Sequence, residues 1–511
     1  MTEYSFRIHH LVEDSARAYP DAIALIDGSG HQVTYTEYQA AITEAAALLQ
    51  NRGVQPGDRV AIVAENCITT AAFIFAASTV GAYALPINAR MTAAEIARVM
   101  THATPCVTVF TTEASKEAAA HAATANAGTQ ETSFGSFAIA VTGTSAPEQV
   151  ADGPDETAVL LYTTGTTGDP KGVMLTHTNL RYAGWASTEL RGMRQDDRIY
   201  GVLPLTHVFG LASMLMAASG IGATIQLEPR FRPDALYAAL MDKATILPAV
   251  PQMHALLMQY ARDQGLSRLE NSNLRYVSSG AAPLDPAWKR KAEAFYGLPL
   301  QNGYGMTEST AGVCGTRNSI GSPDISAGFP LPETEIRLDA SVSAAGDPDA
   351  GEILVRGPQV MKGYFRNPAE TARTIDADGW LRTGDLGKIE EVGNLPVDGR
   401  CKELIIRGGF NVYPPEVEAA LNDHPDVIQS AVIGNVTDGD EEILAFVQCA
   451  DPATLDQDAL AAFVAKRLTG YKRPSRIILT TELPAAPTGK ILKQKLASVF
   501  AEQLAQPATK E

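Results

Sequence analysis

The chain has 511 residues, of which 45% are hydrophobic and 19% charged; this is the composition of a globular protein and excludes a disordered, collagen-like or coiled-coil chain. At roughly 100–200 residues per domain, the length predicts two to four units. The 41 basic and 58 acidic residues leave a formal net charge of −17. That balance argues against a nucleic-acid partner, because phosphate binding needs clustered Lys and Arg.

In the first half of the chain, short apolar runs alternate with segments of helical length. This β-α-β-α order predicts an α/β fold with buried, largely parallel sheets. The composition turns to Ala, Thr, Ser and Gly between Ala114 and Asp155, which indicates a surface connection or the edge of a lobe. The predicted strands are Val60–Ala64, Ala82–Pro86, Cys106–Phe110, Ala158–Tyr162, Ile199–Leu203, Thr224–Leu227, Ile246–Val250 and Leu274–Ser278, and the predicted helices between them include Thr69–Thr79 and Ala93–His102.

From about Gly328 onward, short strands separated by Gly and Asp turns predict an antiparallel subdomain. These strands are expected at Glu335–Leu338, Gly351–Arg356, Leu386–Glu390 and Asn394–Pro396. After Arg400 we expect a small separate α+β domain. It would contain helices at Pro414–Leu421, near Leu455–Leu468 and after Lys490, and strands near Ile428–Ile433 and Glu442–Gln448. The predicted division is therefore a large domain over residues 1–399 and a small one over residues 400–511.

The five cysteines are scattered without a C-x-x-C pair, which favours a reducing compartment over a disulfide framework or a zinc site. Met1–His10 has no apolar core behind a basic start, so we expect no secretory signal. Two long uncharged stretches, Cys67–Ala89 and Ile199–Leu227, are interrupted by Pro, Gly and polar residues. They fit a buried helix and strand better than a membrane span. The expected location is the cytoplasm.

Leu160–Gly172, with the sequence LLYTTGTTGDPKG, runs from an apolar strand into a loop of hydroxyls and glycines that ends in Lys171. Small residues let backbone N–H groups approach an anion, and the lysine adds positive charge, so the loop predicts a phosphate site rather than an ordinary surface turn. It is not a Walker A loop, because Pro170 stands where that motif has Gly. The chain also lacks G-x-G-x-x-G, H-E-x-x-H and G-x-S-x-G, which removes the main support for a dinucleotide oxidoreductase, a zincin or an α/β-hydrolase.

The sequence resembles the adenylate-forming enzymes, which include acyl- and aryl-CoA synthetases, luciferases and peptide-synthetase adenylation domains. Five segments carry the resemblance, and they span nearly the whole chain in the family's order. They are Thr163–Lys171, similar to the phosphate loop; the YGMTE segment from Tyr304 to Glu308; Gly379–Gly387 (GWLRTGDLG); Gly399–Pro414 (GRCKELIIRGGFNVYP); and Pro487–Lys493 (PTGKILK).

The resemblance implies a reaction in two halves, in an AMP-binding domain over 1–399 and a mobile domain over 400–511. A carboxylate attacks the α-phosphorus of ATP, giving an acyl-adenylate and pyrophosphate, and a thiol then displaces AMP. The carboxylate, with a pKa near ~4, is already ionised at neutral pH, so the enzyme must overcome repulsion between anions rather than supply a base. The implied cofactors and substrates are ATP, Mg²⁺, CoA and a small carboxylic acid.

The family's functional positions carry over to residues of this sequence. The implied catalytic residues are Lys490, Thr307, Glu308 and His207, with Glu308 as the metal ligand and Lys402 as the hinge. ATP binding is implied for Thr163, Thr164, Gly165, Thr166, Thr167, Gly168, Lys171, Gly280, Ala281, Ala282, Asn302, Gly303, Tyr304, Gly305, Thr307, Asp385, Arg400 and Lys490. CoA binding is implied for Gly408, Gly409 and Phe410.

Each of these positions also has an ordinary structural interpretation. Glu308 could be a solvated surface carboxylate, Tyr304 simple core packing, and His207 a loop histidine with satisfied hydrogen bonds. Asp385 could cap a turn after Gly384, and a lysine near the chain end, such as Lys490, is usually solvated. The resemblance favours the functional interpretation in each case.

The acyl pocket implied by correspondence consists of His207, Val208, Phe209, Met214, Ser278, Ala281 and Gly303. Apart from His207, its members are uncharged, so we expect an acid with an uncharged tail: aryl, hydroxycinnamate-like or medium-chain fatty. CoA is the simpler acceptor, because only 21 residues follow Lys490, too few for a fused carrier domain. A separate carrier protein, a luciferase-type oxygenation and a non-catalytic nucleotide-binding scaffold are the alternatives. The sequence is compatible with a homodimer.

Overall fold

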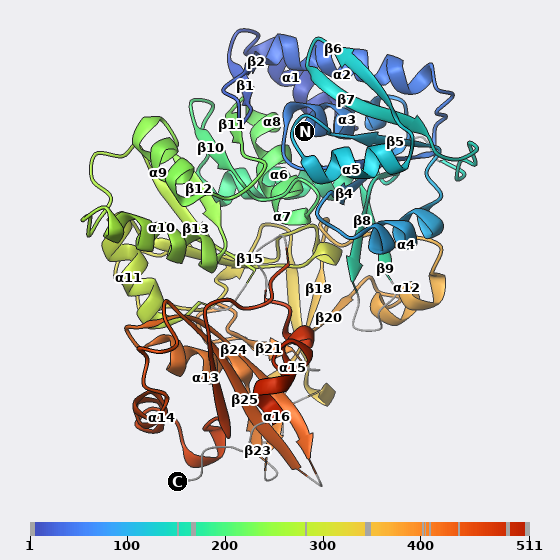
Figure 1. Cartoon of the computed structure of the whole chain (residues 1–511). Coiled ribbons are helices and arrows are strands. Elements are labelled where there is room, and N and C mark those ends of the chain that lie inside the picture. The colour runs from blue at the N-terminus through green and yellow to red at the C-terminus, as the bar shows by residue number, and fades with distance from the viewer. Residues whose placement is uncertain are drawn as a thin grey trace.

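The computed structural model describes residues 6–150, 153–164, 170–281, 284–342, 349–400, 403, 405–407, 410–437, 440–486 and 491–505. It is a mixed α/β protein with a large N-terminal part and a smaller C-terminal part, which lies at one end of the molecule in Figure 1. This confirms the predicted fold class.

An eight-stranded sheet is built from described residues in the order β19-β9-β8-β4-β3-β5-β7-β6. Its central strands β3, β4, β5 and β8 pair in parallel, and β3 is buried at every position, as expected of a parallel strand covered on both faces. The strands are β3 (Arg59–Ala64), β4 (Tyr83–Asn88), β5 (Val107–Phe110), β6 (Gly128–Thr132), β7 (Gly135–Val141), β8 (Thr157–Thr164), β9 (Pro170–Thr176) and β19 (Gly363–Tyr364).

A nine-stranded sheet, again of described residues, has the order β16-β15-β14-β13-β12-β10-β11-β1-β2. The strands from β1 to β14 in this order run parallel, so the carboxyl ends of β12, β13 and β14 meet at one edge. Its strands are β1 (Ile23–Ile26), β2 (Gln32–Thr34), β10 (Arg198–Gly201), β11 (Thr224–Leu227), β12 (Ile246–Ala249), β13 (Tyr276–Ser279), β14 (Leu300–Tyr304), β15 (Cys314–Gly315) and β16 (Phe329–Pro330).

Helices cover these sheets. α3 is apolar on all sides and almost completely buried, while Thr34 and Thr92 start α2 and α4 with capping boxes. The N-terminal helices are α1 (His10–Ala18), α2 (Tyr35–Gln50), α3 (Ile68–Thr79), α4 (Ala93–Ala103), α5 (Lys116–Thr124), α6 (His177–Arg191), α7 (Val208–Gly210), the π-helix η1 (Leu211–Met216), α8 (Ala217–Ile221), α9 (Pro233–Asp242), α10 (Pro251–Asp263), α11 (Pro286–Tyr296), the 3₁₀ turns η2 (Thr307–Ser309) and η3 (Ala340–Val342), and α12 (Pro368–Thr374).

A four-stranded antiparallel sheet, β17-β18-β20-β21, follows in the chain: β17 (Glu335–Asp339), β18 (Ala350–Arg356), β20 (Leu381–Lys388) and β21 (Val397–Arg400). β20 begins earlier than the sequence predicts, because the polar run Arg382–Gly384 hides the start of a strand that pairs with β18 from Leu381. The Asn394–Pro396 segment, expected as a strand, precedes β21. The 114–155 region holds α5 and the β6–β7 hairpin at the sheet's edge, which fits the lobe-edge interpretation.

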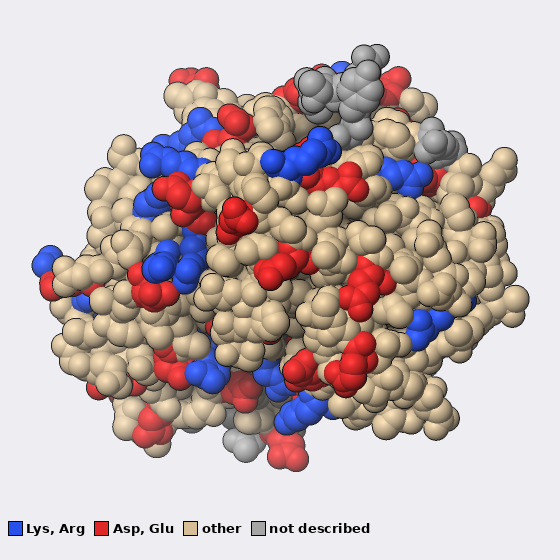
Figure 2. Space-filling view, turned by 90° about the horizontal axis from the view of Figure 1, so that it is seen from above, with Lys and Arg blue, Asp and Glu red and all other residues tan. Residues whose placement is uncertain are grey.

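The C-terminal part has its own core around Val417, Leu421, Ala445 and Leu460. Its elements are β22 (Ile405–Arg407), β23 (Phe410–Val412), α13 (Pro414–Asn422), β24 (Val427–Thr437), β25 (Asp440–Cys449), α14 (Gln457–Ala465), η4 (Gly470–Lys472), β26 (Arg476–Thr480), α15 (Lys493–Val499) and α16 (Ala501–Ala505). Among the described residues, no helix has the length and apolarity to cross a membrane. Acidic and basic side chains are interspersed on the face seen in Figure 2.

Candidate active site

The predicted phosphate loop joins the antiparallel strands β8 and β9, with Thr163 opposite Lys171 and Thr164 opposite Pro170. Gly165, Thr166, Thr167 and Gly168 lie outside the described residues. The Lys171 ammonium forms an ion pair with Glu370 of α12, and its Nζ lies 5.2 Å from the centroid of the Tyr364 ring. The hydrogen bond from Lys171 holds the pKa of Glu370 below its usual value, so this carboxyl stays ionised beside the lysine.

The predicted metal ligand, Glu308, lies in the short turn η2 together with Thr307. Glu308 is only 9% exposed, so its interpretation as a solvated surface carboxylate is wrong. Its Oε1 accepts a hydrogen bond of 2.9 Å from the Tyr364 hydroxyl, and its backbone carbonyl accepts one of 2.9 Å from the Met361 N–H. A buried carboxylate needs such donors, because leaving it without them would cost several kcal/mol.

The backbone around this turn is unusual. Thr310 and Ala311, directly after η2, both have positive φ, at 48° and 77°. Non-glycine residues in this region store strain, which tends to collect at functional sites. Gly305 is required here because a Cβ at this position would lie 2.0 Å from the Ala311 carbonyl oxygen. The YGMTE segment thus follows a narrow path that fixes Thr307 and Glu308.

Tyr304, at the end of β14, meets Asp385 of β20 across 81 residues of sequence: its hydroxyl donates to Asp385 Oδ2 at 2.6 Å. Burial, and next the Asp385 carboxylate, raise the pKa of Tyr304, so it stays a donor. Asp385 is opposite Arg400 in the register of β20 and β21, although the Arg400 side chain is outside the description. The fold therefore brings two of the predicted ATP-binding residues into contact.

Three buried polar atoms at the ends of β13 and β14 have no hydrogen-bond partner among the described residues: Ser278 Oγ, Ser279 Oγ and Asn302 Oδ1. The three residues are 7%, 2% and 8% exposed. The side-chain nitrogen of Asn302 donates a 2.9 Å hydrogen bond to the backbone carbonyl of Ser326, so Asn302 Oδ1 points away from that bond. Unsatisfied buried acceptors are rare in proteins and mark a place where a ligand can supply the missing donor.

Small residues surround these atoms. A Cβ on Gly280 would lie 3.1 Å from the Phe209 ring, and one on Gly303 would lie 3.1 Å from the Cys314 carbonyl oxygen. Ala281 has a φ of 66°, a third strained position near the site. Ala282 lies outside the described residues. A side chain at Gly280 or Gly303 would therefore require its neighbour in this wall to shift by a few tenths of an ångström.

His207 caps the N-terminus of α7, where its Nδ1 accepts a 3.3 Å hydrogen bond from the Phe209 N–H. A neutral ring that accepts at Nδ1 carries its proton on Nε2, the atom that could donate to an acyl carbonyl. The same bond also fits the alternative interpretation of His207 as a loop histidine with satisfied hydrogen bonds. Val208 and Met214, predicted for the acyl pocket, are packed into the main hydrophobic core.

Most of the residues of the C-terminal part that are predicted to act in catalysis, in CoA binding or as the hinge are not among the described residues. Lys402, Gly408, Gly409 and Lys490 lie outside the described residues, and of Phe410 only the backbone is described, paired with Arg407 in the β22–β23 hairpin. Their predicted roles stay predictions.

Comparison with known proteins gives a direct result. The sequence profile described as "AMP-binding enzyme" matches residues 12–365, and the profile "AMP-binding enzyme C-terminal domain" matches residues 416–490. The chain belongs to the AMP-binding enzyme family. The predicted resemblance to the adenylate-forming enzymes is thereby confirmed.

Individual members of the AMP-binding enzyme family match over almost the whole chain. A feruloyl-CoA synthase from an Amycolatopsis species is 34% identical, covering 95% of this chain and 97% of that protein. The 4-coumarate–CoA ligase 5 of Oryza sativa subsp. japonica is 33% identical over 97% and 94%. The structure of the o-succinylbenzoate coenzyme A synthetase of Bacillus subtilis in complex with ATP and magnesium ion superposes with a TM-score of 0.80 at 28% identity, over 95% and 98%.

Sequence reasoning missed residues that support the candidate site. Asn66 donates to the carbonyls of Gly201 and Leu203, both at 2.9 Å, and accepts from Leu205 N–H at 2.8 Å, which fixes the segment leading to His207. His254, fully buried in α10, donates from Nε2 to the Ser278 carbonyl (3.1 Å) while its Nδ1 accepts from the Tyr296 hydroxyl (2.8 Å). Tyr364 and Glu370 were also missed. Their partners are distant in sequence, so no local pattern points to them.

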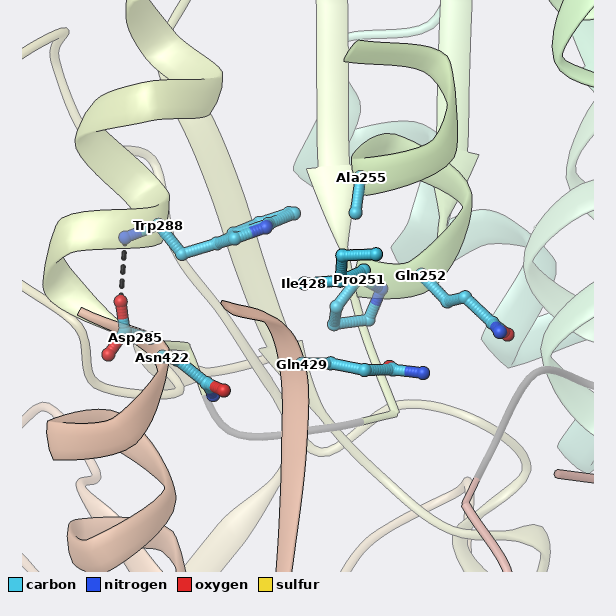
Figure 3. A pocket seen from close by; sticks show the side chains of 8 residues that line it. All are labelled: Pro251, Gln252, Ala255, Asp285, Trp288, Asn422, Ile428 and Gln429. Carbon is cyan, nitrogen blue, oxygen red and sulfur yellow. Dashed lines mark hydrogen bonds between the residues drawn. The ribbon is translucent and has the colours of Figure 1, made fainter. Parts of the chain in front are cut away.

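The pocket in Figure 3 lies elsewhere, between α10 and α11 of the N-terminal part and α13 and β24 of the C-terminal part. It contains none of the residues predicted to bind ATP or the acid. Burial and the nearby Asp423 raise the pKa of Asp285, which caps α11 through a hydrogen bond from the Trp288 N–H. This pocket marks where the two parts of the chain meet.

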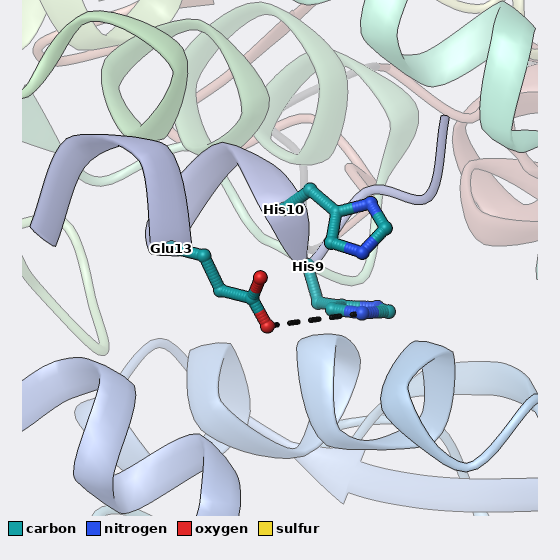
Figure 4. Close-up of side chains that lie close together, drawn as sticks. All are labelled: His9, His10 and Glu13. Carbon is teal, nitrogen blue, oxygen red and sulfur yellow. Dashed lines mark ion pairs between the residues drawn. The ribbon is translucent and has the colours of Figure 1, made fainter. Parts of the chain in front are cut away.

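A cluster at the start of α1 has the composition of a metal site but favours another role. His9, His10 and Glu13 place their ligand atoms within 4.8 Å of one another (Figure 4). His10 Nδ1 accepts a hydrogen bond of 3.3 Å from the Arg7 N–H, which leaves the ring proton on Nε2, and His9 Nδ1 lies 2.9 Å from Ser78 Oγ. Burial, and after it nearby positive charges, lower the pKa of both histidines. A neutral imidazole is also the form that binds a metal, so the lowered pKa values do not decide between the two roles. The hydrogen bonds that occupy Nδ1 of both rings favour a structural role.

Proposed function

We propose that this chain is an AMP-forming carboxylate–CoA ligase that activates an acid with an uncharged tail, of the aryl, hydroxycinnamate-like or medium-chain fatty class. The acid first displaces pyrophosphate from ATP to give an acyl-adenylate, and CoA then displaces AMP to give the thioester. The predicted enzyme class, an acid–thiol ligase, and the use of ATP, Mg²⁺ and CoA are confirmed by the match to the AMP-binding enzyme family and to CoA ligases along nearly the whole chain.

One observation carries the assignment of the ATP site. The Lys171 ammonium lies over the ring of Tyr364, and the Glu308 carboxylate accepts a hydrogen bond from the hydroxyl of the same tyrosine. Lys171 and Glu308 do not form an ion pair with each other. A triphosphate needs a cation and a metal ligand set side by side, and hard carboxylate oxygens are the protein ligands that Mg²⁺ prefers. The residues present therefore fit Mg²⁺–ATP. Glu308 would hold the metal, which when bound neutralises charge on the triphosphate.

The remaining residues of the site fit the rest of the nucleotide. Asp385, held by Tyr304, would accept hydrogen bonds from the ribose hydroxyls. Asn302 Oδ1, a buried acceptor with no partner among the described residues, would accept from the adenine amino group. Thr307 would donate to the α-phosphate, and the N–H groups of the Thr163–Lys171 loop to the other phosphates.

The acid would lie against Gly303, Ala281 and Phe209, with its carbonyl near His207 Nε2–H. The related proteins named for 4-coumarate and ferulate support a hydroxycinnamate-like acid, and the uncharged lining supports any member of the proposed class. The acid reacts as its carboxylate, so its attack requires orientation and charge stabilisation rather than a base.

The boundary near residue 400 fits a two-step mechanism in which the C-terminal domain moves. Lys490 would bridge carboxylate and phosphate oxygens during adenylation. A rotation about Lys402 would then withdraw Lys490 and bring Gly408, Gly409 and Phe410 to the site for CoA. Glycines at that point allow the pantetheine arm to pass close to the backbone.

We place this activity in the cytoplasm, because the described cysteines Cys67, Cys106, Cys314 and Cys449 are free thiols, as expected in a reducing compartment. A homodimer stays a prediction, and analytical ultracentrifugation tests it.

The function is tested with a panel of acids, including 4-coumarate, ferulate, octanoate and succinate, read as pyrophosphate release with and without CoA. We expect Mg²⁺-dependent release with at least one uncharged-tail acid, limited to about one turnover without CoA and continuous with it. Release that only a phosphopantetheinylated carrier protein accelerates would favour carrier loading. No release with any acid would favour a nucleotide-binding scaffold.

A further inference from the structure

Tyr364 is fixed by backbone contacts next to the strand that carries Lys171. β19 pairs antiparallel with β9, with Tyr364 opposite Val173, and α12 follows directly (Figure 1). The neighbouring Phe365 donates its N–H to the Gly172 carbonyl at 2.7 Å. The Tyr364 N–H itself donates to Thr371 Oγ1 of α12 at 2.9 Å. The tyrosine therefore cannot move without disturbing the strand that leads out of the phosphate loop.

Its hydroxyl reaches the predicted metal ligand. Tyr364 is 6% exposed, and the 2.9 Å hydrogen bond to Glu308 Oε1 runs through the protein interior. The carboxylate oxygen can only accept, so the Tyr364 hydroxyl is the donor of this bond. Because Oε1 is held by this bond, the Glu308 carboxylate has one preferred orientation, and Oε2 is left available as a ligand atom.

Its ring carries the predicted phosphate-binding cation. Lys171 Nζ lies 5.2 Å from the ring centroid, within the range of a cation–π contact, and the same ammonium pairs with Glu370 in the first turn of α12. The two groups that must act together on a metal–triphosphate complex are therefore oriented by one side chain.

We propose, on the basis of the proposed function, that Tyr364 is a positioning residue that sets the Glu308 carboxylate for Mg²⁺ and couples metal binding to Lys171. Removing its hydroxyl leaves a buried carboxylate short of one donor and free to rotate. The metal then binds a ligand that must first be ordered, which lowers the affinity for Mg²⁺–ATP more than for ATP alone. Contacts with the acid and with CoA are not affected.

The test is Tyr364→Phe, with ATP binding measured by calorimetry on the full chain across a Mg²⁺ series. In the wild type, we expect Mg²⁺ to tighten ATP binding. We expect the Mg²⁺ concentration for half-maximal effect to rise about tenfold or more in Tyr364→Phe, as for loss of one hydrogen bond to a charged group. The matched control is Tyr38→Phe, because the buried Tyr38 hydroxyl has no partner among the described residues. The control should leave the Mg²⁺ dependence unchanged.

A second variant changes the charge next to Lys171 without touching Tyr364. Glu370→Gln removes the charge that pairs with Lys171 and keeps the hydrogen bond to Glu308, so it should change the affinity for ATP without moving the Mg²⁺ midpoint. An unchanged midpoint in Tyr364→Phe, or an equal shift in Tyr38→Phe, overturns the inference, as does a wild type that binds no ATP. Mg²⁺-coupled ATP binding without pyrophosphate release from any acid would overturn the proposed function and leave the role of Tyr364 intact.

Discussion

The two sides of the candidate site differ in how their polar groups are satisfied. On the metal and phosphate side, Glu308 and Lys171 each have a partner within the protein, Tyr364 and Glu370. On the adenine and acyl side, Ser278 Oγ and Asn302 Oδ1 are buried with no partner among the described residues. A charge without a partner is too costly to bury, whereas a neutral acceptor costs only about 1–3 kcal/mol. Ligand binding would therefore replace protein contacts on the metal and phosphate side, and add new hydrogen bonds on the adenine and acyl side.

The largest expected effect is on the charged side. Glu308→Gln keeps the size of the side chain and the acceptor for Tyr364 but removes the charge that would hold Mg²⁺. We expect the kcat of pyrophosphate release to fall about 10²- to 10³-fold, as for other groups that stabilise developing charge. Glu335→Gln, in an exposed ion pair with Arg356, is the control and should keep nearly full activity. Undiminished kcat in Glu308→Gln would contradict the metal-ligand role.

The Tyr304–Asp385 contact tests whether the two sides meet at the ribose. Asp385→Asn should raise the KM for ATP about ten- to hundredfold, because it weakens charged hydrogen bonds to the ribose as well as the one from Tyr304. Tyr304→Phe breaks only the second of these bonds and should cost less. Steady-state kinetics with ATP varied decides between them. A larger effect of Tyr304→Phe would mean that Asp385 serves mainly as the partner of Tyr304.

Below neutral pH, the folded protein is expected to lose stability through His254, which is hydrogen-bonded to the Ser278 carbonyl on the adenine and acyl side. Burial lowers the pKa of His254 from 6.5 to about 4, so the unfolded chain binds a proton at higher pH than the folded one. The His254 contribution is complete above pH 6.5 and is lost as pH falls towards 4, by up to ~1.4 kcal/mol per pH unit. His254→Gln should make the pH dependence of the unfolding free energy shallower by about one proton in urea titrations between pH 4.5 and 6.

Ser279→Ala, which removes no titratable group, is the control for this measurement and should leave the slope unchanged. Equal slopes for His254→Gln and the wild type would mean that His254 titrates normally in the folded protein.

The smallest effect on stability is expected from removing the buried Ser278 hydroxyl. Ser278→Ala removes a buried group that has no hydrogen bond to lose within the described protein, so the unfolding free energy should stay the same or rise by up to about 1 kcal/mol. Asn302→Ala, in contrast, breaks the bond to the Ser326 carbonyl and should lower it. Chemical denaturation measures both. A clear loss of stability in Ser278→Ala would remove the distinction between the two sides.

The sequence predicted the features that local pattern and the resemblance encode. Apolar runs such as Val60–Ala64 lie in the predicted parallel strands, and the family, the α/β fold and the enzyme class are confirmed. The start of β20 was missed, because the polar run Arg382–Gly384 does not look like a strand. Tyr364 and Glu370 were missed because Glu370 is 199 residues from Lys171, and only the folded chain brings them together. The site roles themselves stay predictions.

The most direct measurement is a crystal structure of the full chain with ATP and Mg²⁺. We expect the triphosphate between Lys171 and the metal on Glu308, with Lys171 turned from Glu370 to the phosphates. The adenine amino group should lie within hydrogen-bonding distance of Asn302 Oδ1. A nucleotide bound away from these residues, or Lys171 still paired with Glu370 in the complex, would contradict the account.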